Sequence, residues 1–98
     1  MDIVKTREGN TLTVAVDGRL DAMNARKLEA ELRKSMDQVT ELIFDFSNLE
    51  YIASGGIRVL VASQKAVGKD GVMKLKNVQP QIMSLLEMTG LVDVFTIE

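Results

Sequence analysis

The sequence predicts an α/β fold, with a mixed, mostly parallel sheet, a leading β-hairpin and helices packed on the sheet. Strand-like segments with alternating apolar residues and helix-like segments with apolar residues at helical spacing follow one another along the chain. Their order is β-β-α-β-α-β-α-β. The first two strand-like segments are separated by only a short turn, which is typical of a hairpin. The 98 residues contain no repeat or linker, so we expect a single domain over residues 1–98.

The hairpin comes first. Ile3–Arg7 is strand-like, Glu8–Asn10 supplies turn residues, and Thr11–Val16 alternates with period two. The apolar side chains of this second strand should face the core. Asp17–Asp21 is then expected to form a loop, in which Asp21, or Asn24 beyond it, is available as the N-cap of the next element.

The next two elements are a helix and a strand. A helix is predicted over Met23–Met36 because one of its faces is apolar, through Ala25, Leu28, Leu32 and Met36. Leu42–Phe46 is the third strand. Its nearly continuous apolar run is typical of a central strand that is covered on both faces.

The second helix is predicted from Gly55 to about Val67, with Gly68 as its C-cap. Ser54 stands at its start, where a serine hydroxyl is a favoured N-cap. Two glycines follow, although each glycine inside a helix costs about 1 kcal/mol relative to alanine. They indicate that something approaches the backbone or the Ser54 oxygen closely. A second, mild apolar stripe fits packing against a neighbouring helix or docking of a partner or second copy: Val59, Ala62 and Ala66.

The remaining residues add a strand, a helix and a strand. Val72–Lys76 alternates and predicts a fourth strand nearer the sheet edge. Pro80, at a first helical position, opens a last helix with Ile82, Leu85 and Leu86 inward, and Gly90 ends it. Val94–Ile97 predicts a short final strand.

This topology predicts where the loops meet. The carboxyl ends of parallel strands share one edge of a sheet, and that edge is where such folds bind ligands. We therefore expect the Asp17–Asp21 loop, the loop holding Ser54 and the Asn77–Gln79 turn to gather there, with Ser54 in the middle.

Composition argues against several classes of function. Without His or Cys the chain has no imidazole base, thiolate nucleophile, phosphohistidine or ordinary zinc site. A carboxylate-only enzyme or Mg²⁺ site using Asp17, Asp21 or Asp45 stays open, but no spacing supports it. We expect no enzyme, metal or cofactor.

Charge and hydropathy argue against two further classes. A net charge of −2, with basic and acidic residues spread along the chain, gives no basic patch for nucleic acid. No apolar run approaches the roughly 20 residues that span a bilayer, and the residues Met1–Lys5 lack the charged and apolar regions of a signal peptide, so we expect a cytoplasmic protein.

Several segments together match a known pattern. Weak matches are the hairpin, residues 18–21 before the first helix, residues 43–49 and the closing residues 85–91. The specific block is Tyr51–Leu60, which reads YIASGGIRVL. Together they span nearly the whole chain and resemble the STAS domain family, in particular its stand-alone anti-sigma factor antagonists.

The resemblance implies a phosphorylation switch. In the family, the unphosphorylated antagonist binds an anti-sigma factor that is often also a serine kinase with a histidine-kinase-like ATPase fold, which frees a sigma factor. Phosphorylation of the loop serine breaks the complex, and a PP2C-type phosphatase restores it. Ser54 lies where the family has that serine, and Asp21 where it has an aspartate thought to help dock the partner. The implied partner-binding residues are Asp21, Ala53, Gly55, Gly56 and Arg58.

Two positions depart from the family pattern. Well-known members carry an aspartate immediately before the phosphorylated serine, where this chain has Ala53, and often a hydroxyl residue after it, where it has Gly55. Ser54 is thus the only hydroxyl between Ile52 and Arg58. The alternative function is a non-switching STAS subunit of a lipid-transport, stress-sensing or transporter assembly.

A receiver-like or nucleotide-binding domain is a further alternative with less support. A receiver would need an acidic cluster around an acceptor aspartate and a lysine after the last strand. The last residues, Phe95–Glu98, contain no lysine. Gly55-Gly56 is too short to cradle phosphates and lacks the Walker-type lysine.

Overall fold

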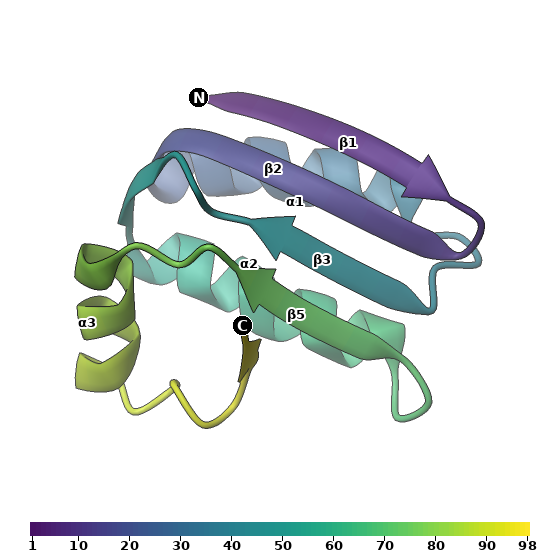
Figure 1. The fold of residues 1–98 in the computed structure, drawn as a ribbon. Coiled ribbons are helices and arrows are strands. Elements are labelled where there is room, and N and C mark those ends of the chain that lie inside the picture. The colour runs from purple at the N-terminus through teal and green to yellow at the C-terminus, as the bar shows by residue number, and fades with distance from the viewer.

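Six strands and three helices make up the fold (Figure 1). The structure is a computed structural model and describes residues 1–98. In chain order the elements are β1 (Asp2–Glu8), β2 (Thr11–Leu20), α1 (Ala22–Ser35), β3 (Glu41–Asp45), β4 (Leu49–Ile52), α2 (Ser54–Val67), β5 (Val72–Lys76), α3 (Pro80–Met88) and β6 (Thr96–Ile97).

The strand β2 organises the sheet. It pairs antiparallel with β1 as the predicted hairpin, closed by Glu8 opposite Thr11. Its first half pairs in parallel with β3, and after a register shift at Gly18 and Arg19 its last residues pair in parallel with β4. The β3–β5 and β5–β6 pairs are also parallel. The predicted mixed, mostly parallel sheet is confirmed.

Two predictions for this region were wrong. Asp17–Leu20, predicted as loop, continues β2, and Leu49–Ile52, which the predicted order passes over, forms β4. The order is therefore β-β-α-β-β-α-β-α-β. The cause lies in tertiary pairing: the Gly18 N–H donates to the Asn48 carbonyl at 2.9 Å, and the strand then continues against β4. Local composition does not reveal such a partner.

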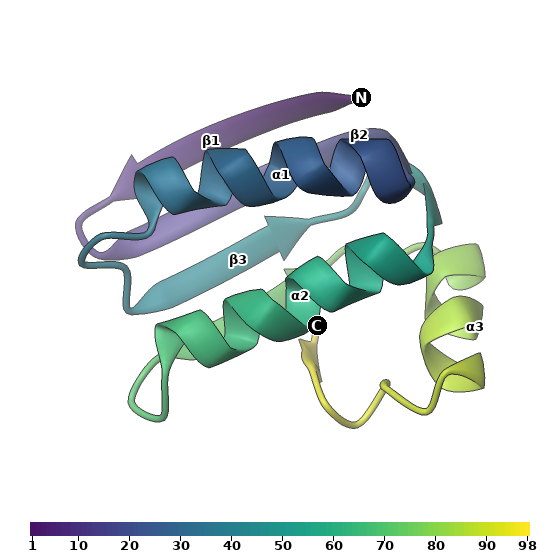
Figure 2. The same cartoon turned by 180° about the vertical axis from the view of Figure 1, so that it is seen from behind.

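The helices α1 and α2 lie on the same face of the sheet. Figures 1 and 2 show both helices behind the sheet in one view and in front of it in the other, while the opposite face carries no helix. α3 stands beyond the strand ends, next to β4. In β3, Leu42 and Phe44 are buried but Ile43 and Asp45 only partly, so the prediction that both faces are covered was wrong.

The core fills the layer between sheet and helices. It contains 21 buried hydrophobic residues, among them the predicted Ala25, Leu28 and Leu32 of α1. The predicted helix ends also hold: Gly68, at φ +79°, closes α2, and Pro80 stands in the first turn of α3. The final strand is limited to Thr96–Ile97, shorter than predicted, because the residues before it form turns.

Candidate functional site

The candidate site lies at the carboxyl ends of β2 and β4. The last residues of these strands, Leu20 and Ile52, are opposite each other in the parallel register. The Ala53 N–H then donates to the Leu20 carbonyl at 2.9 Å. Asp21 lies one residue beyond Leu20 and Ser54 two residues beyond Ile52, at the starts of α1 and α2. Figure 2 shows the starts of α1 and α2 at the same edge of the sheet. The structure therefore brings Asp21 and Ser54 to one edge, as the sequence predicts.

Asp21 is the N-cap of α1. Its backbone is extended, and its Oδ1 accepts a hydrogen bond from the Asn24 backbone N–H at 2.9 Å. The Asn24 side chain in turn donates from Nδ2 to the Arg19 carbonyl at 2.8 Å. Of the two caps that the sequence allows, Asp21 is thus the one used. The Asp21 side chain remains partly exposed, so capping does not hide it.

Ser54 is not an N-cap, and that prediction was wrong. Ala53 occupies the cap position, with extended φ and ψ of −96° and 172°, and no side chain bonds the first turn. Ser54 is instead the first residue of α2, and it is exposed. Because the Ala53 side chain has no oxygen, the first N–H groups of α2 lack the side-chain acceptor that helix starts usually have.

Packing explains the second of the two glycines but not the first. A Cβ built on Gly56 would lie 2.8 Å from Leu20 Cγ and 2.8 Å from Ile52 Cγ1, too close for any side chain. A Cβ on Gly55 would lie 3.5 Å from the Ala22 Cα, in ordinary contact with α1. The close approach that the sequence indicates is therefore found at Gly56, where α2 packs against the ends of β2 and β4.

Two arginines lie near this edge. Arg58 is exposed and lies four positions after Ser54, which places both on one face of α2. The Arg19 guanidinium lies over the Tyr51 ring, 4.4 Å from its centroid, and joins β2 to β4. Arg58 is among the residues that the resemblance implies, whereas the contact of Arg19 with Tyr51 depends on β4, which the sequence does not predict.

The Asn77–Gln79 turn reaches the same edge through β3. The Asn77 side chain donates to Asp45 Oδ1 at 3.0 Å, and Gln79 Nε2 donates to the Ser47 carbonyl at 2.8 Å. The hydrogen bond from Asn77 lowers the pKa of the Asp45 carboxyl, and a bond from the Ser47 backbone N–H at 3.0 Å adds to the effect. These contacts hold the loops around the strand ends in place, a structural role for Asp45.

No group of three or more acidic side chains gathers as a candidate metal site. None of the helices has the length and apolar character needed to cross a membrane.

Comparison with protein families identifies relatives over the whole length. The model of the STAS domain family matches residues 2–98. The anti-sigma-B factor antagonist of Bacillus subtilis is 32% identical over 95 residues, which cover 96% of this chain and 86% of that protein.

Comparison with solved structures shows the same fold in other proteins. An anti-sigma factor antagonist from Mycobacterium paratuberculosis superposes with a TM-score of 0.87 at 24% identity, covering 98% of this chain and 83% of that one. The anti-sigma factor antagonist SpoIIAA in its unphosphorylated form gives 0.77 at 16% identity, covering 99% and 87%. SpoIIAA of Bacillus in its phosphorylated form gives 0.77 at 18% identity, covering 99% and 91%.

Proposed function

The chain belongs to the STAS domain family, and we propose that it is an anti-sigma factor antagonist controlled by phosphorylation of Ser54. The antagonists of this family are regulatory proteins and not enzymes, so binding is the activity to explain. In the proposed cycle, the unphosphorylated protein binds an anti-sigma factor in the cytoplasm. That partner is a serine kinase of the histidine-kinase-like ATPase fold, and a PP2C-type phosphatase reverses the modification.

The observation that carries the proposal is the position of Ser54. It is an exposed hydroxyl in the first position of α2, beside Asp21 at the start of α1. No other hydroxyl occurs between Ile52 and Arg58. A kinase can reach this oxygen without opening the fold, and a relative with this fold occurs in phosphorylated and unphosphorylated forms.

Phosphorylation at this position is compatible with the folded state. A phosphoryl group brings about −1.5 to −2 charges at neutral pH. The start of a helix favours negative charge by about 0.3–1 kcal/mol, because N–H groups and the positive end of the helix dipole face it. Here the first turn has no side-chain cap to compete, and Arg58 lies one turn along the same face. We therefore expect the modified protein to keep its structure.

The same charge acts strongly at an interface. A phosphate that loses its water, or meets a like charge on the partner, costs several kcal/mol. Since 1.4 kcal/mol corresponds to tenfold, the affinity falls by about two decades or more. Loss of the partner, rather than a change of fold, is thus the proposed output.

The proposed contact surface contains Asp21, Ala53, Ser54, Gly55 and Arg58, which are exposed or partly exposed. Gly56 completes the proposed set in a different way. It is buried against Leu20 and Ile52, so it sets where α2 starts and does not offer atoms of its own to a partner.

The test is incubation with the cognate kinase and ATP, followed by mass mapping and a binding measurement. Phosphate should appear at Ser54, Ser54→Ala should bind the anti-sigma factor without being switched off, and Ser54→Asp should bind poorly. Ser47→Asp, at an exposed serine in a neighbouring loop, is the matched control and should bind normally. Phosphate at Ser47, Ser63 or Thr89 and not at Ser54 would place the switch elsewhere.

The second candidate is a STAS subunit of a larger assembly that is not switched. The cap position of α2 favours it, because Ala53 stands where well-known antagonists have an aspartate. In that case no phosphate is found after incubation with the kinase, and Ser54→Asp binds as well as the unaltered protein.

A further inference from the structure

The outer edge of β1 has no strand partner. β1 is the first strand of the sheet and pairs with β2 on one side only (Figure 1). It is seven residues long, contains no proline and keeps an unbroken register from Asp2 to Glu8. Such an edge presents backbone N–H and C=O groups to which another strand can be added.

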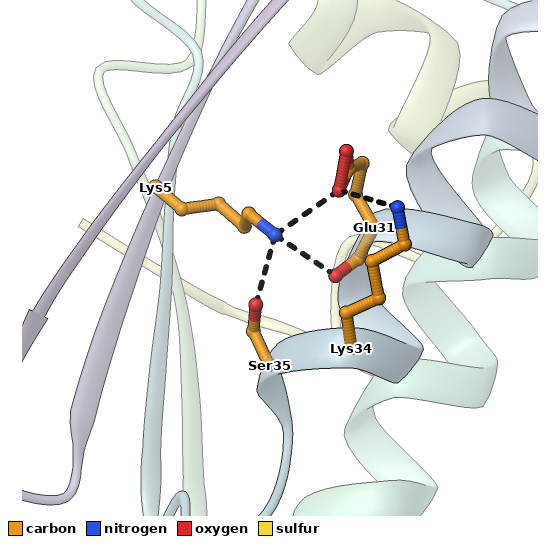
Figure 3. Close-up of polar contacts among 4 residues, drawn as sticks. All are labelled: Lys5, Glu31, Lys34 and Ser35. Atoms are coloured by element: carbon orange, nitrogen blue, oxygen red, sulfur yellow. Dashed lines mark hydrogen bonds and ion pairs between the residues drawn. The ribbon is translucent and has the colours of Figure 1, made fainter.

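Lys5 fastens this edge to α1, as Figure 3 shows. Its Nζ donates to Glu31 Oε2 at 3.1 Å, to the Glu31 carbonyl at 3.2 Å and to Ser35 Oγ at 2.9 Å. Lys34 Nζ lies 3.7 Å from the same Glu31 oxygen. The hydrogen bond from Lys5 and the charge of Lys34 lower the pKa of Glu31. The one acid of this cluster is therefore ionised and already shared by two cations.

The other cations beside the edge have no carboxylate partner. The Arg7 guanidinium donates only to carbonyls, from Nε to Gly9 at 2.9 Å and from Nη1 to Ser35 at 3.0 Å. Lys27 on α1 is exposed and belongs to none of the ion pairs.

The face of β1 that is turned toward α1, together with the adjoining flank of α1, is thus positively charged, whereas the rest of the chain is net negative. Its charged residues are four cations and one anion, a net charge of +3: Lys5, Arg7, Lys27, Lys34 and Glu31. The whole chain carries −2, so the rest carries −5. Asp2 and Glu8, at alternate positions of β1, belong to the other face of the strand.

A hollow lies between β1 and α1. Its volume is about 400 Å³, and it is lined by Met1, Ile3, Lys27, Ala30, Glu31 and Lys34. Half of these side chains are apolar and the two lysines border them. The strand edge, the positive charge and this hollow lie side by side.

We propose that the β1 edge and the adjoining flank of α1 bind an acidic, extended segment of a partner protein as an added strand. Backbone hydrogen bonds to β1 give affinity, while a side chain of the segment in the hollow and carboxylates beside Lys27 and Lys34 give specificity. A second copy of this chain fits poorly, because pairing β1 with itself would set one +3 cluster against another. This surface is separate from Ser54, so the inference holds whether or not Ser54 is phosphorylated.

The test uses a synthetic seven-residue peptide with Glu, Val and Glu at its second, fourth and sixth positions and Thr at the others, so that the carboxylates and the apolar side chain share one face of the strand. It is titrated into the ¹⁵N-labelled full chain. The backbone amides of residues 2–8 should shift, and those that point away from β2 should become protected from hydrogen exchange. The affinity should fall as salt is added. The same peptide with Lys in place of Glu should bind at least about tenfold more weakly. Absence of shifts in β1 at about 1 mM acidic peptide would overturn the proposal.

A charge-reversal pair supplies the control. Lys27→Glu with Lys34→Glu should weaken the peptide at least about tenfold, because each reversal turns an attraction into a repulsion. Lys65→Glu with Lys69→Glu makes the same charge change at exposed lysines near the end of α2 and should leave binding nearly unchanged. Equal losses in both pairs would show attraction to net charge alone. Light scattering tests the second copy. A doubled mass of the unaltered protein that is lost in Val4→Lys, at an exposed position of β1, would assign the edge to a second copy. Either result would refute the proposal.

Discussion

Replacing Gly56 by alanine should destabilise the protein, whereas the same change at Gly55 should not. The added Cβ at Gly56 would stand 2.8 Å from carbon atoms of Leu20 and Ile52. Both side chains are fully buried and cannot turn aside. Overpacking of this kind costs about 1–3 kcal/mol. At Gly55 the nearest atom, the Ala22 Cα at 3.5 Å, leaves room for a methyl group.

The neighbouring glycine makes the magnitude measurable. Both substitutions gain the better helix propensity of alanine, at most about 1 kcal/mol, so this gain cancels in the comparison. The two variants should then differ in free energy of unfolding by about the overpacking cost, 1–3 kcal/mol. For a domain of this size each kcal/mol corresponds to a melting temperature change of about 4–8 °C.

Urea unfolding followed by circular dichroism, together with thermal melts, checks this prediction. Gly55→Ala should unfold at or slightly above the unaltered protein and Gly56→Ala clearly below Gly55→Ala. Coincident transitions of the two variants would refute the packing explanation of Gly56. They would return the second glycine to a role in partner or kinase access.

Three further predictions concern the same edge. Ala53→Asp should raise the free energy of unfolding by about 0.5–2 kcal/mol in urea titrations, because it supplies the missing cap of α2; no gain would mean that the first turn is satisfied in another way. Asp21→Ala should lose about 1 kcal/mol with the bond to Asn24 and should also weaken anti-sigma factor binding; unchanged binding would remove Asp21 from the contact surface. The folded pKa of Asp45 is lowered, so its stabilising effect is present above the unfolded pKa of about 3.9 and disappears as pH falls through the folded value. The stability difference between the unaltered protein and Asp45→Asn should accordingly shrink between about pH 5 and pH 2, and a difference independent of pH would contradict this.

The helices could be predicted from the sequence because their signals are local. Pro80 at a helix start and Gly68 at a helix end act through their own backbone preferences, and the apolar stripe of α1 needs no knowledge of what it packs against. The hairpin was accessible for the same reason, since a short turn joins two alternating segments.

The parts that sequence reasoning missed depend on distant partners. Asp17–Leu20 has the composition of a loop, and only pairing with Leu49–Ile52 makes it a strand. The start of α2 was misplaced by one residue because a serine is a better cap than an alanine. In the protein, the contact of Gly56 with Leu20 and Ile52 fixes the start of α2 instead, and no local rule contains that contact.

The pairing of β2 with β4 has a consequence for the kinetics of recognition. Leu20 is opposite Ile52, and Asp21 and Ser54 lie one and two residues beyond these strand ends, so the ladder itself sets their spacing. The two residues of the proposed contact surface are thus already fixed relative to each other, and little conformational entropy would be lost in ordering them for a partner. Association should be fast, with differences between partners expressed mainly in dissociation rates. Removing one residue from β4 would shift Ser54 by about 3.3 Å along the ladder and reverse the alternation of its neighbours. The length of this four-residue strand is therefore as much a part of the recognition surface as the side chains it positions.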